Sequence, residues 1–561
     1  FVKLYDEGAT VPFIARYRKE KTQNLDDAQL RALEKSLNYE RDMATRRLKI
    51  TELLSTQGNL TDELQTRIDN ATSKLELEDI YLPYRPRRRS PAAKARAAGL
   101  DTAAQAVLTQ EITPTDALAD YQVQSSITDD SGNEIEVDFS DIEKQLAGVQ
   151  AIIVDEWTQA LGLLDNLRSG FAKTASIVSS VASEEKREVG EKFKDYFEHS
   201  ESLARLPNHR LLAMLRGRQE NVLGLKIEGE DTPFIEKIIS HFDVDAKAPA
   251  ARREFLAEAA SSLWKDKWRP HIEHRLLTEK RLAAEADAID VFASNLQHLL
   301  MSAPAGPKVI LGVDPGIRHG VKMAIVDAQG HVMSDSEEKP VIATVYPFAP
   351  DNKMDEAKKV IDALLSTYNV DLVAIGNGTA SRETDAMIKE ILAANDTLKA
   401  KAVIVNESGA SVYSASELAS DELANLDVSV RGAVSIARRL QDPLSELVKV
   451  DPKAIGVGQY QHDVNQNQLA DSLDKVTQDS VNAVGVDVNT ASPAILAHIA
   501  GLNRNVAQQI VTYRKEHGAF DSREALKNVP RLGAKTFEQA AGFLRIHNGS
   551  NPLDATGVHP E

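Results

Sequence analysis

The hydrophobic positions in the first 300 residues repeat with the period of an amphipathic helix. Apolar residues recur three and four positions apart among charged ones, as at Leu30, Leu33 and Leu37. This pattern continues until Ser302-Ala303-Pro304-Ala305-Gly306-Pro307, a Pro- and Gly-containing segment that interrupts it. The spacing therefore predicts that residues 1–300 fold as helix after helix.

After this break the chain changes to short apolar runs rich in β-branched residues. Two runs joined by a short turn come first and a third follows, and two further strand-like runs then alternate with helical stretches. The strand-like runs are 308–313, 321–326, 341–346, 372–375 and 402–405, and the helical stretches between them are 355–367 and 384–394. This is the element order of the ribonuclease-H-like fold. We expect a mainly α multidomain protein with one α/β ribonuclease-H-like domain.

Helical sequence returns from about residue 410. Residues 491–549 read as a compact all-helical unit with glycine-centred turns at Gly501 and Gly533. The polar, Pro-containing segment 550–561 is predicted to be a linker to a further domain.

Composition narrows the class of protein. At roughly 100–200 residues per domain, 561 residues predict about three to five domains. The net charge of −18 excludes a protein that coats nucleic acid by bulk positive charge, so any such contact needs a local patch. The chain has no cysteine, which excludes disulfides and thiolate zinc sites and fits a reducing cytoplasm. No apolar stretch approaches a membrane span, and we expect a cytoplasmic fragment of a longer protein, because the chain starts at Phe1.

Charge is unevenly distributed in the helical region. Residues 81–100 contain six bases and no acid, whereas residues 101–150 contain eleven acids and one base. The basic cluster includes Arg85, Arg87, Arg88 and Arg89. It is interpreted as a phosphate-facing patch, as a solvated surface or as a partner for the acidic segment, since charge alone does not separate these cases.

Acidic residues at strand ends form the candidate catalytic site. Asp314 ends the first strand in Gly312-Val313-Asp314-Pro315-Gly316, and Glu407 follows the fifth. Asp479 or Asp487 is a candidate for a third ligand. Converging carboxylates could hold Mg²⁺ for phosphodiester cleavage. The alternative is that these residues cap helices and turn amides.

Several runs resemble segments of the Tex family of bacterial transcription accessory proteins. Residues 309–320 are similar to the opening of a YqgF/RuvC-like domain of ribonuclease-H fold. The other similar runs are 10–19, 375–384, 406–414, 431–440 and 456–464, so the resemblance covers essentially the whole chain.

The resemblance implies a nucleic-acid-binding protein with several domains. The expected parts are an N-terminal helical region with a helix-turn-helix-like element (1–200), a helical region (201–303), the YqgF domain (304–430), a helical connector (431–490) and a helix-hairpin-helix domain (491–549). Tex-like proteins normally continue into an OB-fold domain, which this sequence lacks. The match to a working nuclease is incomplete, because the strand-four position reads Gly376-Asn377-Gly378 instead of a glutamate and 72 residues separate Glu407 from Asp479. The resemblance therefore implies a fold retained for binding, with cleavage weak, conditional or absent.

The strongest binding signal is the pair of predicted hairpins. Residues 529–536 resemble a helix-hairpin-helix turn and residues 499–503 its degenerate twin. Unpaired amides at the start of the following helix can bind a phosphate. Residues 501–550 hold eight bases and four acids, which suits a backbone-binding face. The candidate contacts are Gly501, Asn503, Arg531, Gly533, Lys535 and Thr536; the alternative is a capped helical turn with a solvated lysine.

These features predict a sequence-independent nucleic-acid-binding transcription accessory factor. RNA, DNA or both are the expected ligands, RNA polymerase or the transcription and translation machinery are possible protein partners, and binding needs no cofactor. One alternative is a Mg²⁺-dependent structure-specific nuclease of the RuvC/YqgF type that uses Asp314, Glu407 and Asp479 or Asp487. Another is an interaction scaffold whose acidic surface serves protein partners alone.

Overall fold

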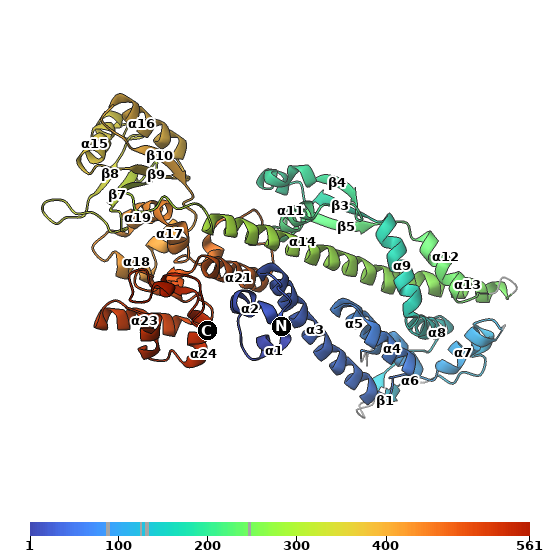
Figure 1. Ribbon diagram of the computed structural model, residues 1–561. Helices are drawn as coiled ribbons and strands as arrows, with labels where there is room; N and C mark the ends of the chain where they lie inside the picture. Colours follow the sequence, from blue (N-terminus) through green and yellow to red (C-terminus); the bar gives the residue numbers. More distant parts are fainter. Residues whose placement is uncertain (86–89, 111, 124–125, 129–133, 245–247) are drawn as a thin grey trace. The chain divides into compact units, whose positions relative to one another are not determined.

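The computed structural model describes residues 1–85, 90–110, 112–123, 126–128, 134–244 and 248–561. The chain forms two compact units, one of residues 1–34 with 287–561 and the other of residues 35–286 (Figure 1). The chain passes between the units within two long helices, α3 (Asp27–Thr56) and α14 (Arg269–Leu300). Residues 1–34 therefore belong with the C-terminal half of the chain, unlike the expected region 1–200.

The unit of residues 35–286 is mostly helical, as the apolar spacing predicts. Its further helices are α4 (Asp62–Asn70), α5 (Lys74–Tyr81), α6 (Pro91–Ala97), α7 (Asp101–Thr109), α8 (Ile142–Trp157), α9 (Leu161–Thr174), α10 (Lys186–Val189), α11 (Asn208–Gln219), α12 (Thr232–His241) and α13 (Ala250–Ser262). Short helical turns are η2 (Leu82–Tyr84), η3 (Asp116–Leu118), η4 (Glu191–Tyr196) and the π-helical η5 (Leu263–Trp268), and β1 (Ser126–Thr128) pairs with β2 (Glu134–Glu136).

The prediction of uninterrupted helix to residue 300 is wrong for residues 176–228. Three segments of this range form a three-stranded antiparallel sheet of order β4-β3-β5, with β3 (Ser176–Val181), β4 (Glu198–Ser202) and β5 (Leu223–Glu228). Helices α10, η4 and α11 lie between these strands along the chain. Buried and half-buried side chains alternate over the first four residues of β3, a signal too short to stand out among long helices. An expected boundary after residue 200 falls inside β4, so residues on both sides of it belong to one sheet.

The ribonuclease-H-like domain has the predicted topology. Its sheet has the order β10-β9-β6-β7-β8, antiparallel among β6 (Ile310–Asp314), β7 (Val321–Val326) and β8 (Ile342–Val345) and parallel from β6 through β9 (Leu372–Gly376) to β10 (Lys401–Val405). The apolar side chains of α15 (Met354–Thr367) and α16 (Ser381–Ala394) share a buried core with one face of this sheet. The opposite face is covered by α19 (Val428–Gln441).

The expected domain boundary at residue 430 falls inside α19. This helix packs directly on β6 and β7, because small residues on both sides allow a close approach. The sheet domain therefore extends to residue 441. The helices before and after α19 are α17 (Ala410–Ser414), α18 (Glu417–Glu422), α20 (Pro443–Leu447) and α21 (Gln466–Val484), with the short turn η6 (Pro452–Ala454) between the last two.

The hairpin region follows α21 and packs with residues from the N-terminus. It consists of α22 (Pro493–Leu496), α23 (Arg504–His517), η7 (Arg523–Asn528) and α24 (Ala534–Ala540), with β11 (Val486–Asp487) parallel to β12 (Leu544–Arg545). The N-terminal elements of the same unit are α1 (Val2–Asp6), α2 (Val11–Tyr17) and η1 (Lys19–Lys21).

The predicted linker 550–561 is instead packed on this hairpin region. It contains the short turn η8 (Pro552–Ala555), in which Asp554 is buried. The Asp554 carboxylate accepts a hydrogen bond from the Arg523 amide at 2.8 Å, and the Arg523 guanidinium donates to the Val558 carbonyl at 2.7 Å. The Tyr17 hydroxyl donates to the Gly557 carbonyl at 2.9 Å. Buried polar contacts, which its polar composition does not reveal, make this segment part of the fold.

Candidate carboxylate site and nucleic-acid interface

Asp314 ends β6 on the side of the sheet that α19 covers. Successive strand residues alternate between faces, so Gly312 and Asp314 share one. A β-carbon on Gly312 would lie 2.0 Å from the Ala433 carbonyl oxygen, and one on Gly432 would lie 2.8 Å from the Asp314 Oδ2. The Asp314 carboxylate therefore lies against the N-terminal half of α19. Burial raises the pKa of Asp314. The charge of Lys322, the residue of β7 that pairs with Asp314, opposes this shift.

Glu407 lies in the loop after β10, and its carboxylate fits between two glycines at the end of β9. A β-carbon on Gly376 would lie 2.1 Å from the Glu407 Oε2, and one on Gly378 would lie 1.7 Å from Oε1. Neither position can carry a larger side chain while Glu407 stays in place. The sequence Gly376-Asn377-Gly378, which departs from the nuclease pattern, thus leaves the space that the Glu407 carboxylate occupies.

Two polar side chains hold the loop that carries Glu407. The Asn377 Oδ1 accepts a hydrogen bond from the Glu407 amide at 3.1 Å. On the other side, the buried Arg439 of α19 donates from Nη1 to the carbonyls of Asn406 at 2.9 Å and Ser408 at 2.8 Å. The Asn377 side-chain oxygen is therefore engaged with the backbone, and Arg439 positions the loop that presents Glu407.

The structure brings Asp314 and Glu407 together, as the sequence predicts for strand ends at one sheet edge. Burial raises the pKa of Glu407, and the nearby charge of Asp314 raises it further. A backbone hydrogen bond from Gly378 and the charge of Arg439 act in the opposite direction. Two neighbouring carboxylates with raised pKa values resist simultaneous ionisation unless a cation joins them.

Asp479 and Asp487 are not brought to this pair. Asp479 lies on α21 and forms a two-pronged ion pair with Arg31, with distances of 3.0 Å from Nε to Oδ2 and 2.6 Å from Nη2 to Oδ1. Asp487 lies in β11, where its Oδ1 accepts from the Asn489 amide at 2.7 Å. The covering helix that reaches Asp314 is α19, so a ligand sought 72 residues beyond Glu407 belongs to a different part of the fold.

A two-metal centre does not fit the residues present. In the described part of the chain, no three His, Cys, Asp or Glu side chains are grouped as metal ligands. Two-metal phosphodiester chemistry needs carboxylates on both sides of a cation pair. The site offers one pair of acids, Asp314 and Glu407. The side-chain oxygen of Asn377 already accepts a hydrogen bond from the Glu407 amide, so these residues do not form the ligand set of a two-metal centre.

The two hairpins near the C-terminus repeat one backbone geometry. Gly501 has a φ of +80° and Arg531 a φ of +68°, so each turn contains one left-handed residue at the equivalent point. In each turn the next residue donates to an apolar position three residues earlier: Leu502 N to Ile499 O at 3.0 Å and Leu532 N to Val529 O at 3.2 Å. Gly533, expected to make the second turn, has a φ of −74°, and Arg531 adopts the left-handed conformation instead.

Each hairpin ends at a helix N-terminus on the protein surface. Asn503 begins α23 and its Oδ1 accepts from the Val506 amide at 3.0 Å, while the following two residues are exposed. Gly533 begins α24 without a side-chain cap and is exposed, as are Ala534 and Lys535. Thr536, the third residue of α24, is half-buried. The first amides of both helices therefore face solvent, where they can accept an anion.

Only part of the positive charge in this region is available to a ligand. Three of its eight bases serve the interior: Arg523 is buried, Arg514 donates to the carbonyls of Val488 and Ala491, and Arg545 lies against Gly485. The Lys535 ammonium donates to the Glu7 carbonyl, and Lys527 pairs with Glu524. Within the described residues, no hydrogen bond or ion pair engages the remaining three exposed bases, which are Arg504, Lys515 and Arg531.

The basic cluster of residues 85–96 is largely paired where it can be described. Arg85 forms an ion pair with Glu78 and lies over the Tyr81 ring at 5.7 Å from its centroid. Arg96 pairs with Asp155 at 2.6 Å. The candidates Arg87, Arg88 and Arg89 lie outside the described residues. Arg96 also pairs with Asp101 of the acidic segment 101–150, at 3.4 Å, whereas Glu78 and Asp155 lie outside that segment. Both described arginines therefore have acidic partners, and only Arg96 pairs with the acidic segment.

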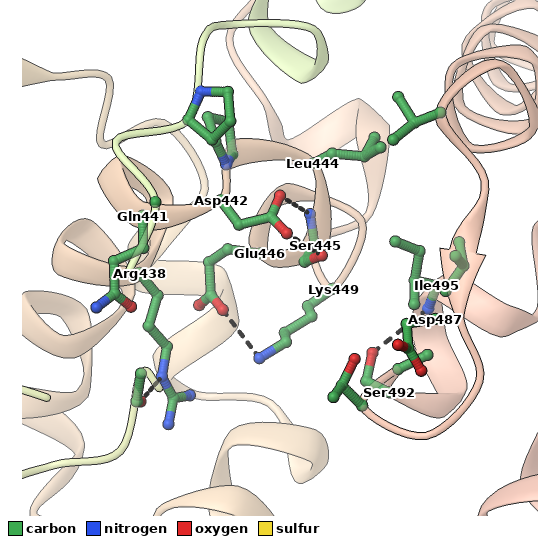
Figure 2. Close-up of a pocket in the computed structure, with 18 of the residues that line it drawn as sticks. Arg438, Gln441, Asp442, Leu444, Ser445, Glu446, Lys449, Asp487, Ser492 and Ile495 are labelled. Atoms are coloured by element: carbon green, nitrogen blue, oxygen red, sulfur yellow. Dashed lines mark hydrogen bonds and ion pairs between the residues drawn. The ribbon is translucent and has the colours of Figure 1, made fainter. Parts of the chain in front are cut away.

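A cleft of about 810 Å³ lies beside α19 and α20, and of the candidate site residues only Asp487 lines it. Figure 2 shows Lys449 pointing toward Glu446, with an ion pair at 2.9 Å. Lys449 and Arg438 also contact Glu422, at 2.9 and 3.2 Å. Their helical spacing carries no signal that distinguishes them from surface ion pairs. The lining holds four acids, Glu422, Asp442, Glu446 and Asp487, against two bases, Arg438 and Lys449, so the net charge of the cleft disfavours an anionic ligand.

The fold and these sites define a class of protein: a multidomain helical protein that combines a ribonuclease-H-like domain with paired helix-hairpin-helix turns. Comparison with known families agrees along the chain. Residues 1–55 match the Tex-like protein N-terminal domain, 117–292 the Tex central region, 308–441 the Tex protein YqgF-like domain and 481–545 a helix-hairpin-helix motif.

Individual relatives are similar over the whole chain. Protein tex of Bordetella pertussis is 48% identical over 574 residues, which covers 100% of this chain and 70% of that protein. The transcriptional accessory protein Tex of Neisseria gonorrhoeae is 46% identical, covering 100% of this chain and 71% of that protein. The human S1 RNA-binding domain-containing protein 1 is 36% identical over 97% of this chain and 54% of its own length. The chain belongs to the Tex family.

None of the helices in the described ranges has the length and apolar character needed to cross a bilayer.

Proposed function

We propose that this chain binds the backbones of nucleic acids through its paired hairpins, as an accessory factor in transcription in the cytoplasm. The observation that carries the proposal is the repetition of one turn geometry at Gly501 and Arg531, each followed by exposed helix amides. The name of the gonococcal relative supports a role in transcription, and that of the human relative supports RNA binding.

The chemistry of the interface predicts little sequence preference. Amide-to-phosphate contacts contain no base information, so RNA and DNA are both proposed ligands, and no cofactor is needed. Arg504 and Arg531 would supply the local positive charge that an acidic chain needs to hold a polyanion. Lys535 contributes less, because its ammonium is already hydrogen-bonded to the Glu7 carbonyl.

Charge reversal at the two turns tests this proposal. The variant Arg504→Glu with Arg531→Glu should bind a fluorescent oligonucleotide at least about tenfold more weakly, since two phosphate contacts become repulsive. Lys399→Glu is the matched control, because Lys399 is exposed in the sheet domain and makes no hydrogen bond or ion pair within the described residues. Equal affinity of the double variant and the control would refute the hairpin interface.

We further propose that the Asp314–Glu407 site does not cleave nucleic acid. The acid pair favours the nuclease alternative, but the site lacks a third grouped ligand among the described residues. Branched DNA and RNA incubated with Mg²⁺ or Mn²⁺ should stay intact with both the native chain and Asp314→Asn. A cleavage product that the native chain forms and Asp314→Asn does not form would support the nuclease alternative.

RNA polymerase is the proposed protein partner, on the strength of the transcription role of the family. A pull-down with the purified polymerase should survive nuclease treatment if the contact is direct. Loss of the polymerase after nuclease treatment would show that nucleic acid alone joins the two.

A further inference from the structure

The three-stranded sheet of residues 176–228 has an open edge at strand β5. In the order β4-β3-β5, strand β5 pairs only with β3 within the described residues. The Ala182 amide donates to the Val222 carbonyl at 2.8 Å, which turns the backbone of residue 222 toward β3. Backbone groups alternate along a strand, so those of Leu225 and Ile227 point away from β3. These outward groups can pair with a further strand.

A slot lies along this edge, bounded on its other side by α14. Figure 1 shows β5 beside α14, and a cavity of about 710 Å³ separates their side chains. Four consecutive residues of β5, 225–228, line it, as expected of a slot that follows the strand edge. Across the slot, the Arg269 guanidinium touches the outward Ile227 carbonyl at 3.5 Å, a long contact that another donor could replace.

The walls of the slot combine apolar and basic groups. Ile177, Leu225 and Leu277 line it, and the last two are half-buried. Lys226, Lys265 and His274 also line it and are exposed, with no hydrogen bond or ion pair in the described part of the chain.

The acids of the slot lining are nearly as numerous as its bases, with Glu228 and Glu273 against Lys226, Lys265 and Arg269. Glu273 is bound to Arg269 at 2.8 Å, and Arg269 also pairs with Asp231 at 2.5 Å. Among the lining groups that no hydrogen bond or ion pair engages in the described residues, Lys226 and Lys265 outnumber Glu228, so acidic side chains of an occupant can pair with these two lysines.

We propose that this slot binds an extended, acidic and apolar peptide segment of a partner protein, which adds a strand to β5. Backbone pairing with Leu225 and Ile227 supplies affinity, as in other domains that add a strand to a sheet edge. Apolar side chains of the peptide cover Leu225 and Leu277, and its acids approach Lys226 and Lys265. A nucleic acid is a poorer fit, because it cannot pair with the alternating donors and acceptors of a strand edge.

The direct test uses a fluorescein-labelled octapeptide of alternating Asp and Val and the full chain. Lys226→Glu with Lys265→Glu should weaken binding at least about tenfold, since two attractive contacts become repulsive. Lys173→Glu is the matched control, because Lys173 is exposed on α9 and does not line the slot. An octapeptide with Pro in place of Val keeps the charge but lacks the amide donors, and it should bind at least about tenfold more weakly than the Asp-Val peptide.

Hydrogen exchange locates the peptide. The amides of Leu225 and Ile227 should exchange about tenfold or more slowly in the complex, as they do when a strand pairs. Absence of binding, equal affinity of the slot variant and the control, or unchanged exchange at these amides would each overturn the proposal. Displacement of the bound peptide by an oligonucleotide in Lys173→Glu but not in the slot variant would assign the slot to nucleic acid and also overturn it.

Discussion

A β-carbon on Gly432 would lie 2.8 Å from the Asp314 Oδ2, so the helix that covers the carboxylate site brings a glycine to Asp314. A nuclease that cuts with two metals needs further acids around such a residue. The second acid here is Glu407, and its carboxylate lies between Gly376 and Gly378. This combination retains the shape of the ribonuclease-H-like site but leaves it one pair of acids among the described residues.

The raised pKa of Asp314 makes stability depend on pH. The raised pKa means that the folded state disfavours the charged form of Asp314. The contribution of Asp314 to stability is therefore fully present below the pKa of the unfolded chain, about 3.9. It is lost as the pH rises through the pKa of the folded chain. Asp314→Asn removes this titration. We expect its thermal midpoint to exceed that of the native chain at pH 8 and the difference to shrink toward pH 4. A difference that is the same at both values would contradict the assignment.

The Glu407 carboxylate lies so close to Gly378 that we expect a larger residue at position 378 to destabilise the chain. Gly378→Ala places a methyl group where the Glu407 Oε1 now lies, so the flexible Glu407 side chain must move aside and lose its hydrogen bond from the Gly378 backbone. This should destabilise the chain by about 0.5–1.5 kcal/mol. Gly533→Ala is the control, because nothing lies within 4 Å of a β-carbon there and its φ is −74°. Thermal or denaturant unfolding measures both. Equal losses of stability in the two variants would contradict the close contact between Gly378 and the Glu407 carboxylate.

A buried carboxylate stabilises the helical unit of residues 35–286. Asp79 contacts Arg168 at 2.7 Å, Arg275 at 3.0 Å and His271 at 3.1 Å. Asp79→Ala leaves Arg168 and Arg275 without their anion and should cost about 3–5 kcal/mol. Asp42→Ala removes an exposed pair with Lys74 and should cost less than about 1 kcal/mol. Comparable losses would show that the Asp79 cluster is not a stabilising centre.

The packed C-terminal segment predicts that Arg523 is needed for folding. Its Nε donates to the Leu544 carbonyl at 2.8 Å, and its Nη atoms donate to the carbonyls of Val558 and Thr556. Arg523→Met leaves buried acceptors unpaired and should cost about 3–5 kcal/mol. Lys527→Met, which removes an exposed pair with Glu524, should cost less than about 1 kcal/mol. Limited proteolysis should cut residues 551–561 faster in Arg523→Met alone.

The sequence predicts the sheet domain well because its strands carry strong local signals. Asp314 and Glu407 each follow a β-branched run, and strand ends at one edge converge whatever the rest of the chain does. The third acid could not be placed, since the distance along the chain does not show that α19 covers Asp314 and α21 does not.

Other features depend on contacts between distant residues. The close fit of Glu407 against Gly378 and the capture of Lys535 by the Glu7 carbonyl join segments far apart in the sequence. The hairpins were found because their apolar and turn residues are local. The left-handed conformation of Arg531 was missed, because glycine is the usual residue there and Gly533 stands only two residues away.

Salt dependence of oligonucleotide binding tests the central claim most directly. We expect the affinity of the native chain to fall several-fold or more between about 50 and 200 mM salt, as counterions released from phosphates make binding less favourable. The double variant Arg504→Glu with Arg531→Glu should show a shallower slope, and Lys399→Glu should match the native chain. Binding that is insensitive to salt, or a slope unchanged in the double variant, would contradict the account.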